Sequence, residues 1–147
     1  MDEVLRRMIA QLTGSNLEAW IIFEGQSTDW LVQNSLVVLD QATLRWRYES
    51  NRGDEYRKCL KETDKLRNDR NLVIHGDWAT TNRLSSPAKP RSTDAAHAAE
   101  TFFVMRSRYR RWGHEECWSA ADVDAVASAI QDWITRVIVI LDEDQEL

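Results

Sequence analysis

The sequence predicts a mainly α-helical bundle with one inserted β-hairpin. Apolar residues recur at helical spacing, with matching start and stop residues, in four long segments. Between the third and fourth of these segments, apolar and charged residues alternate with the period of two that is typical of a strand. With 147 residues, 43% of them hydrophobic, the chain has the size and composition of a single domain over residues 1–147.

The first part of the chain is expected to be helical. Residues 2–12 carry apolar side chains at helical spacing. Asn16 is expected to cap a short helix that reaches Phe23. Asp29 is a favourable N-cap residue for a longer helix over residues 30–46, whose density of apolar residues predicts a central place in the bundle.

The third long helix is expected to run from near Asp54 to His75. Residues 51–53 read Asn-Arg-Gly and predict a turn before it. Gly76 follows at the position where helices commonly end in a left-handed residue. This helix is therefore expected to stop at His75.

The segment of residues 77–111 is expected to be an insertion that holds the β-hairpin. Its two strands are predicted over residues 77–84 and 101–110. Between them lie a loop over residues 85–94, rich in serine and proline, and one or two helical turns over residues 94–100.

The last helix is expected to begin after Ser119 and to reach Leu141. Ser119 and Asp122, three positions later, form the pattern of a capping box. The two cysteines, Cys59 and Cys117, are too few for a disulfide framework or a zinc site, and we expect buried or half-buried thiols.

Charge is distributed unevenly, although the net charge is only −5. Residues 57–111 carry 13 lysines and arginines and six acidic residues, whereas the rest of the chain carries six basic and 18 acidic residues. A basic middle between acidic ends favours an anionic partner for one face. The alternative is that folding brings the basic and acidic segments close together, so that their charges cancel and no face is strongly basic.

Arg106, Arg108 and Arg110 share one face of the second predicted strand, because alternate residues of a strand point the same way. Arginines bind phosphates, and the aromatic residues between and beside them can stack on bases. The alternative is an exposed hairpin whose arginines prevent edge pairing. Trp78, close after His75, is the tryptophan that we expect to line a cleft.

The group of polar residues best suited to catalysis lies at the end of the third predicted helix. Asn71 and His75 are four residues apart on one side of it, with Arg67 at the edge of that side. The last turn of a helix favours a protonated imidazole, which suits an acid or a base. Arg70 points away from His75 into an apolar stripe, where an arginine needs a partner. It either pairs with a carboxylate of another helix or bends towards the polar face.

The pattern Arg70-Asn71-x-x-x-His75, with a glycine after the histidine, resembles the R-x4-H motif of the HEPN superfamily (higher eukaryotes and prokaryotes nucleotide-binding). The resemblance implies a bundle of four or five helices, usually a homodimer, and the predicted helices over residues 30–46 and 119–141 match the flanking ones. Many active members of the family are metal-independent ribonucleases, often toxins or defence effectors, and others bind partners without cleaving.

Under this interpretation the chain is a metal-independent endoribonuclease that needs no cofactor. His75 acts as base or acid, Arg70 stabilises the charged transition state, and Asn71 orients His75 or binds a phosphate oxygen. One histidine is few for two proton transfers, so we expect a homodimer that brings two copies together. The residues expected to bind RNA are Arg67, Trp78, Arg106, Arg108 and Arg110.

Two other hypotheses stay open. The chain could be a non-catalytic HEPN-like module that binds a nucleotide, RNA or protein partner, or a purely structural dimerisation domain. One toxin branch of the family carries a tyrosine two positions after the histidine, where this chain has Asp77. The expected partners are a second copy, RNA and a protein antitoxin or regulator.

No run approaches the ~20 apolar residues of a membrane span, and the acidic N-terminus lacks an apolar signal core, so we expect a cytoplasmic protein without a membrane partner.

Overall fold

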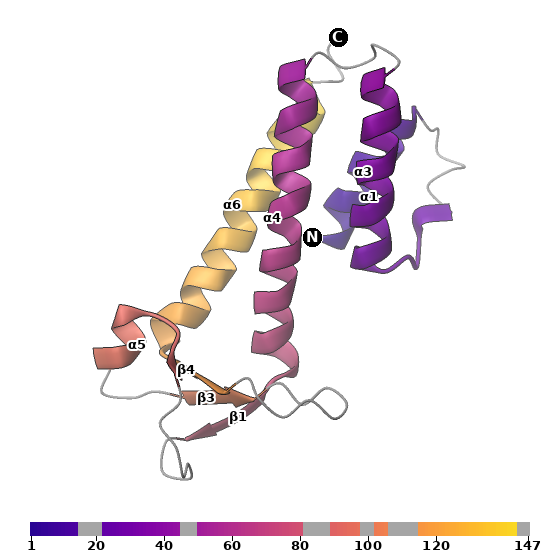
Figure 1. Ribbon diagram of the computed structural model, residues 1–147. Helices are drawn as coiled ribbons and strands as arrows, with labels where there is room; N and C mark the ends of the chain where they lie inside the picture. The colour runs from indigo at the N-terminus through magenta and orange to yellow at the C-terminus, as the bar shows by residue number, and fades with distance from the viewer. Residues whose placement is uncertain (15–21, 45–49, 81–88, 98–101, 106–114, 144–147) are drawn as a thin grey trace. The chain divides into compact units, whose positions relative to one another are not determined.

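The computed structural model of the chain describes residues 1–14, 22–44, 50–80, 89–97, 102–105 and 115–143. It is a mainly helical bundle, as the sequence predicts (Figure 1). The chain clusters into two compact units, Met1–Lys65 with Ile130–Leu147, and Leu66–Ala129. The described elements are α1 (Asp2–Thr13), α3 (Thr28–Leu44), α4 (Ser50–His75), β1 (Asp77–Thr80), β2 (Lys89–Pro90), α5 (Thr93–His97), β3 (Phe102–Met105), β4 (Glu115–Trp118) and α6 (Ala120–Glu143).

The first unit is built from α1, α3, the first part of α4 and the last part of α6. Helix α1 packs against α3 and buries Leu5, Met8, Ile9 and Leu12, because this spacing repeats on one side of a helix. The Trp133 indole of α6 donates a hydrogen bond of 2.9 Å to a carbonyl of α4. Buried apolar side chains of the other helices are Leu31, Val32, Leu39, Tyr56, Leu60, Trp133, Val137 and Leu141.

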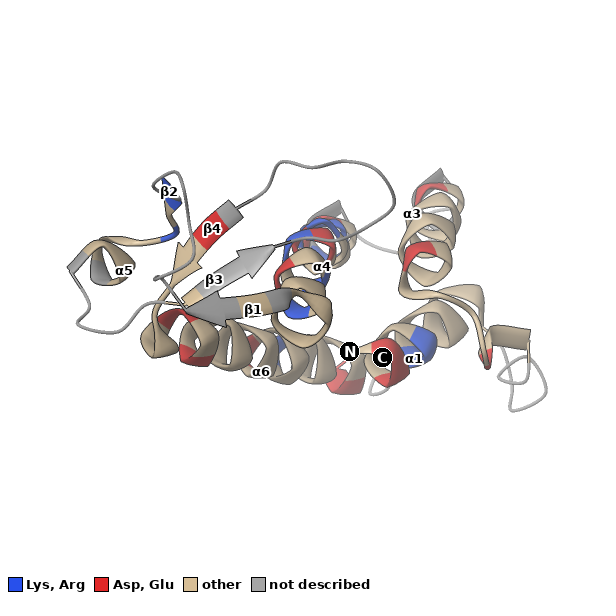
Figure 2. Ribbon diagram, turned by 90° about the horizontal axis from the view of Figure 1, so that it is seen from below, with Lys and Arg blue, Asp and Glu red and all other residues tan. Residues whose placement is uncertain are grey.

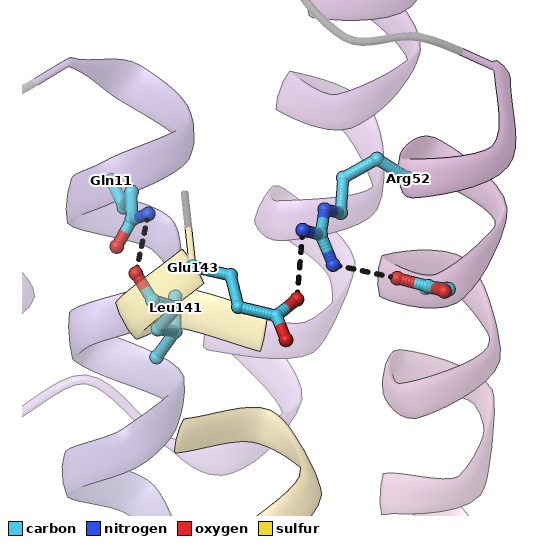
Figure 3. Close-up of polar contacts among 5 residues, drawn as sticks. Gln11, Arg52, Leu141 and Glu143 are labelled. Atoms are coloured by element: carbon cyan, nitrogen blue, oxygen red, sulfur yellow. Dashed lines mark hydrogen bonds and ion pairs between the residues drawn. The ribbon is translucent and has the colours of Figure 1, made fainter. Parts of the chain in front are cut away.

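Polar contacts also tie the helices of this unit together near the end of α6 (Figure 3). The Gln11 side-chain amide donates to the Leu141 carbonyl at 3.0 Å. Arg52 forms ion pairs of 2.9 Å with Glu55 and with Glu143. The pair with Glu143 joins the first turn of α4 to the last turn of α6, and the Gln11 contact joins α1 to α6.

The start of α4 corrects one prediction. Residues 51–53 do not form a turn but lie in the first turn of α4, which begins at Ser50. Gly53 is buried there, and the ion pairs of Arg52 hold the same turn. Tertiary contacts thus override the weak helix propensity of Asn and Gly.

The cap of α3 is also different from the one predicted. The Trp30 N–H donates to the Ser27 hydroxyl at 3.2 Å, so Ser27 and not Asp29 is the N-cap residue. Asp29 instead lies in the first turn, where a carboxylate interacts favourably with the helix dipole. The predicted helix over residues 30–46 is confirmed as far as residue 44, and most of the short helix expected between Asn16 and Phe23 lies outside the described residues.

The second unit contains a four-stranded sheet in the order β1-β3-β4-β2. The predicted hairpin is confirmed where it is described, because β1 pairs with β3 in antiparallel register, Trp78 opposite Val104. The sheet is larger than predicted: β4 continues it antiparallel to β3, and β2 pairs parallel with β4 inside the segment expected to be a loop. The helical turns expected over residues 94–100 are confirmed by α5 as far as His97, and residues 98–100 lie outside the described residues.

The beginning of α6 confirms the predicted capping box. The Ser119 N–H donates to Asp122 Oδ2 at 2.7 Å, and the Asp122 N–H donates to the Ser119 hydroxyl at 3.2 Å. Cys59 and Cys117 are free, buried thiols, as expected. Among the helices described, none combines the length and apolarity that a bilayer crossing requires.

Candidate functional site

The last turns of α4, in the second unit, hold Arg67, Arg70, Asn71 and His75. Arg70 and His75 are exposed, and Arg67 and Asn71 are half-buried. Arg70 Nη1 donates to Asn71 Oδ1 at 3.4 Å, which is a long hydrogen bond. An exposed guanidinium, an amide and an exposed imidazole therefore occur within the last turns of one helix.

The side of α4 that carries Arg70 is not the buried apolar stripe that the sequence predicts. Leu66 is buried, but Ile74 is 54% exposed and Arg70 is open to solvent. Within the part of the chain that the structure describes, no carboxylate forms an ion pair with Arg70. The guanidinium keeps its hydration, so burial does not oblige it to find a partner.

Trp78 of β1 folds back onto the end of α4. Its indole N–H donates to the Val73 carbonyl at 3.0 Å, which satisfies one of the carbonyl groups that a helix end leaves unpaired. The Gly76 N–H also donates into the helix, to Leu72 at 2.9 Å. Gly76 is not in the left-handed conformation that the sequence suggested; among the described glycines only Gly14 and Gly25 have positive φ. Trp78 is 37% exposed, so one part of the ring caps the helix and another meets solvent.

A second exposed aromatic residue lies on the same face of the sheet as Trp78. Phe102 is opposite Thr80 in the register, and Thr80 is two residues from Trp78, so both aromatic residues point to one face. Phe102 is also 37% exposed and lies opposite the fully buried Trp118. The Trp78 and Trp118 rings meet edge to face, with centroids 5.9 Å apart.

Arg91, just after β2, connects this aromatic pair to α4. Its guanidinium carbon is 4.0 Å from the centroid of the Trp118 ring. It forms ion pairs with Asp69 of α4 at 2.6 Å and with Glu116 of β4 at 3.3 Å. Glu116 also accepts a hydrogen bond of 3.1 Å from the Trp118 indole. Arg91 was absent from the sequence-based site because it lies in a segment without periodicity, so no pattern singled it out.

Asp122, in the first turn of α6, is influenced by the charge of Arg91. Burial raises the pKa of its carboxyl group. Hydrogen bonds from Ser92 and from the Ser119 backbone and hydroxyl, together with the charge of Arg91, lower this pKa by more than burial raises it. The net effect is a pKa below the ordinary value. The carboxylate therefore stays ionised and ties the segment before α5 to the start of α6.

Arg106, Arg108 and Arg110 lie outside the described residues, so the predicted basic strand face has no structural description. Within the described ranges, no group of three or more His, Cys, Asp or Glu side chains is arranged to hold a metal ion.

Comparison of the chain with models of known protein families, with curated proteins and with solved structures finds no match.

Proposed function

We propose that this chain is a metal-independent endoribonuclease of the HEPN type, acting as a toxin or defence effector, with its active site at the end of α4. The observation that carries the proposal is the exposure of Arg70 and His75 on the last two turns of one helix. A guanidinium and an imidazole that act on a ligand must be accessible to it, and both of these side chains are.

The proposed reaction uses the nucleophile that RNA itself carries. The 2′-oxygen attacks the phosphorus and loses its proton to a base, and the bond from phosphorus to the 5′-oxygen breaks as that oxygen gains a proton. His75 supplies one of these proton transfers. Arg70 interacts with the negative charge that grows on the phosphoryl oxygens, and Asn71 holds Arg70 or a phosphate oxygen. The products are a 2′,3′-cyclic phosphate and a free 5′-hydroxyl.

A homodimer belongs to this proposal, because one imidazole per chain is few for a base and an acid. A second copy of the α4 end would supply the other histidine. Light scattering at micromolar concentration tests this part, and a monomer that cleaves RNA would remove it.

The proposed RNA contacts are Arg67, Trp78 and the arginines at positions 106, 108 and 110. The partly exposed Trp78 ring supports a stacking role for a base beside the reacting phosphate. The non-catalytic alternative draws on the same feature: a rigid aromatic surface held by Trp118 suits binding as well as cleavage. A protein antitoxin or regulator that covers this surface is compatible with either function.

Cleavage of RNA in EDTA separates these functions. We expect wild-type protein to release a 2′,3′-cyclic phosphate and His75→Ala to lower the rate by about 10²-fold or more. His97→Ala makes the same chemical change at a histidine to which the sequence assigns no role, and it should cleave normally. Binding without cleavage would favour the non-catalytic module, and cleavage that tolerates His75→Ala would remove the assignment.

A further inference from the structure

An open, shallow groove lies along α4 in the first unit. It has a volume of about 540 Å³, and every residue that lines it is charged: Asp54, Arg57, Lys58, Lys61, Glu62 and Lys65. Three of the four lysines of the protein, Lys58, Lys61 and Lys65, lie in this groove. Figure 2 shows that basic and acidic residues alternate around α4.

Ion pairs engage the acidic residues of the groove and leave the lysines available. Arg57 pairs with Asp40 of α3 at 2.7 Å and with Asp54 at 3.5 Å. Glu62 pairs with Arg136 of α6 at 2.5 Å. In contrast, the exposed Lys58, Lys61 and Lys65 have no carboxylate partner among the residues that the structure describes.

The lysines form one line along the helix. Their spacing of three and four residues places them on the same side of α4, over about 10 Å of its axis. Three like charges in a row repel one another in the free protein, and a chain of phosphates that runs along the groove would neutralise them.

The chemistry of the lining favours a nucleic-acid backbone over a protein partner. None of the six residues that line the groove is aromatic or aliphatic, and its apolar surface comes from the methylene stems of these charged side chains, so a protein segment would find no hydrophobic side chain against which to anchor. Base stacking also has no aromatic surface within that lining. A lysine ammonium binds phosphate as a point charge and is indifferent to sequence.

We propose that this groove binds the phosphodiester backbone of single-stranded nucleic acid, without sequence preference, through Lys58, Lys61 and Lys65. This site goes beyond the proposed ribonuclease function, because it involves other residues and no chemical step. Its role is to hold a strand by electrostatic attraction, and its binding is therefore strongly salt-dependent.

The test uses the full chain and fluorescein-labelled oligothymidylate, which lacks the 2′-hydroxyl and so reports binding independently of cleavage. Anisotropy titrations over a series of salt concentrations give the slope of log affinity against log salt. Lys58→Gln, Lys61→Gln and Lys65→Gln should each lower the magnitude of this slope by about 0.7, and the triple variant by about 2. The triple variant should also bind about tenfold or more weakly at low salt, whereas triple substitution by Arg should retain the wild-type slope.

Lys89→Gln is the matched control, because Lys89 is an exposed lysine of β2 outside the groove. It should leave affinity and slope unchanged. Absence of binding by the wild type, or an unchanged slope in the triple variant, would overturn the proposal. So would displacement of the probe by polyglutamate as effectively as by unlabelled oligothymidylate, because that result would indicate a site for acidic proteins. The two proposals can fail independently. If the groove does not bind oligothymidylate, the proposed cleavage by His75 is unaffected. If the protein does not cleave RNA, the proposed binding of oligothymidylate is unaffected.

Discussion

The Arg91 guanidinium lies over the Trp118 ring, 4.0 Å from its centroid, and also forms an ion pair with Asp69 of α4. Trp118 meets Trp78 edge to face, and Trp78 donates to the Val73 carbonyl of α4. The end of α4 is therefore held to the sheet by a continuous series of polar and aromatic contacts. This series supports the candidate site, so changes in it should alter stability even where they touch no ligand.

Replacing Arg91 with Met should lower the free energy of unfolding by about 2 kcal/mol. The change leaves the carboxylates of Asp69 and Glu116 without their cation in a partly buried place, and partial exposure keeps the cost below that of a fully buried pair. Urea unfolding followed by circular dichroism measures the difference. Arg91→Lys should recover only part of it, since an ammonium cannot bridge two carboxylates and stack on Trp118 in the same way.

Arg7→Met is the matched control for this change. Arg7 forms an exposed ion pair with Asp142, and such pairs contribute little. We expect a loss of less than about 1 kcal/mol. If Arg91→Met is as mild as Arg7→Met, Arg91 does not hold the end of α4.

Acid should destabilise the protein partly through Asp122. Its pKa is lowered in the folded state: burial raises it, but the hydrogen bonds from Ser92 and Ser119 outweigh burial. The stabilisation is thus present above the unfolded value of about 3.9 and is lost as the pH falls through the lower, folded pKa.

The test of this dependence is Asp122→Asn. At neutral pH the variant should be less stable by about 1 kcal/mol, because the capping box loses its charged member. Its stability should also fall less steeply than that of the wild type when urea unfolding is repeated at acid pH. Parallel pH profiles for the two proteins would show that Asp122 does not carry the effect.

Local patterns explain which parts of this fold the sequence predicted. Ser119 and Asp122 are three residues apart, so their contact depends only on the helix that they start. The pairing of β1 with β3 followed from alternation along the chain. In contrast, β4 is four residues long with no alternation, and β2 has only two residues. Strand β4 forms because β3 offers it a neighbour, and β2 forms because β4 does.

In the candidate site, too, the features set by residues close in sequence were predicted and those set by tertiary contacts were not. The helical end that carries Arg70 and His75 was predicted from spacing, but the exposure of Arg70 was not. Arg91 could not be found from sequence, because its partners Asp69 and Glu116 are 22 and 25 residues away and are brought together only by the sheet.

Ser35→Ala should stabilise the protein by about 1 kcal/mol. Ser35 is fully buried in α3, and within the described residues its hydroxyl has no hydrogen-bond partner. Removal of an unsatisfied hydroxyl avoids its desolvation cost, and alanine has the higher helix propensity. Thr63→Val is the comparison, because the buried Thr63 hydroxyl donates to the Cys59 carbonyl at 3.0 Å. That change should give no gain in urea unfolding, and equal gains would contradict the account of Ser35.

Trp78 combines a structural and a proposed binding role, and two substitutions separate them. Trp78→Phe keeps an aromatic ring but loses the hydrogen bond to the Val73 carbonyl, so it should cost about 1 kcal/mol of stability and retain affinity for single-stranded RNA. Trp78→Ala also removes the stacking surface, so it should weaken affinity by about tenfold or more. Anisotropy with a 2′-O-methyl oligouridylate, which cannot be cleaved, measures the binding. Val139→Ala, at an exposed apolar residue of the first unit, should leave the affinity unchanged. Wild-type affinity in a folded Trp78→Ala protein would restrict Trp78 to capping α4 and remove it from the proposed RNA contacts.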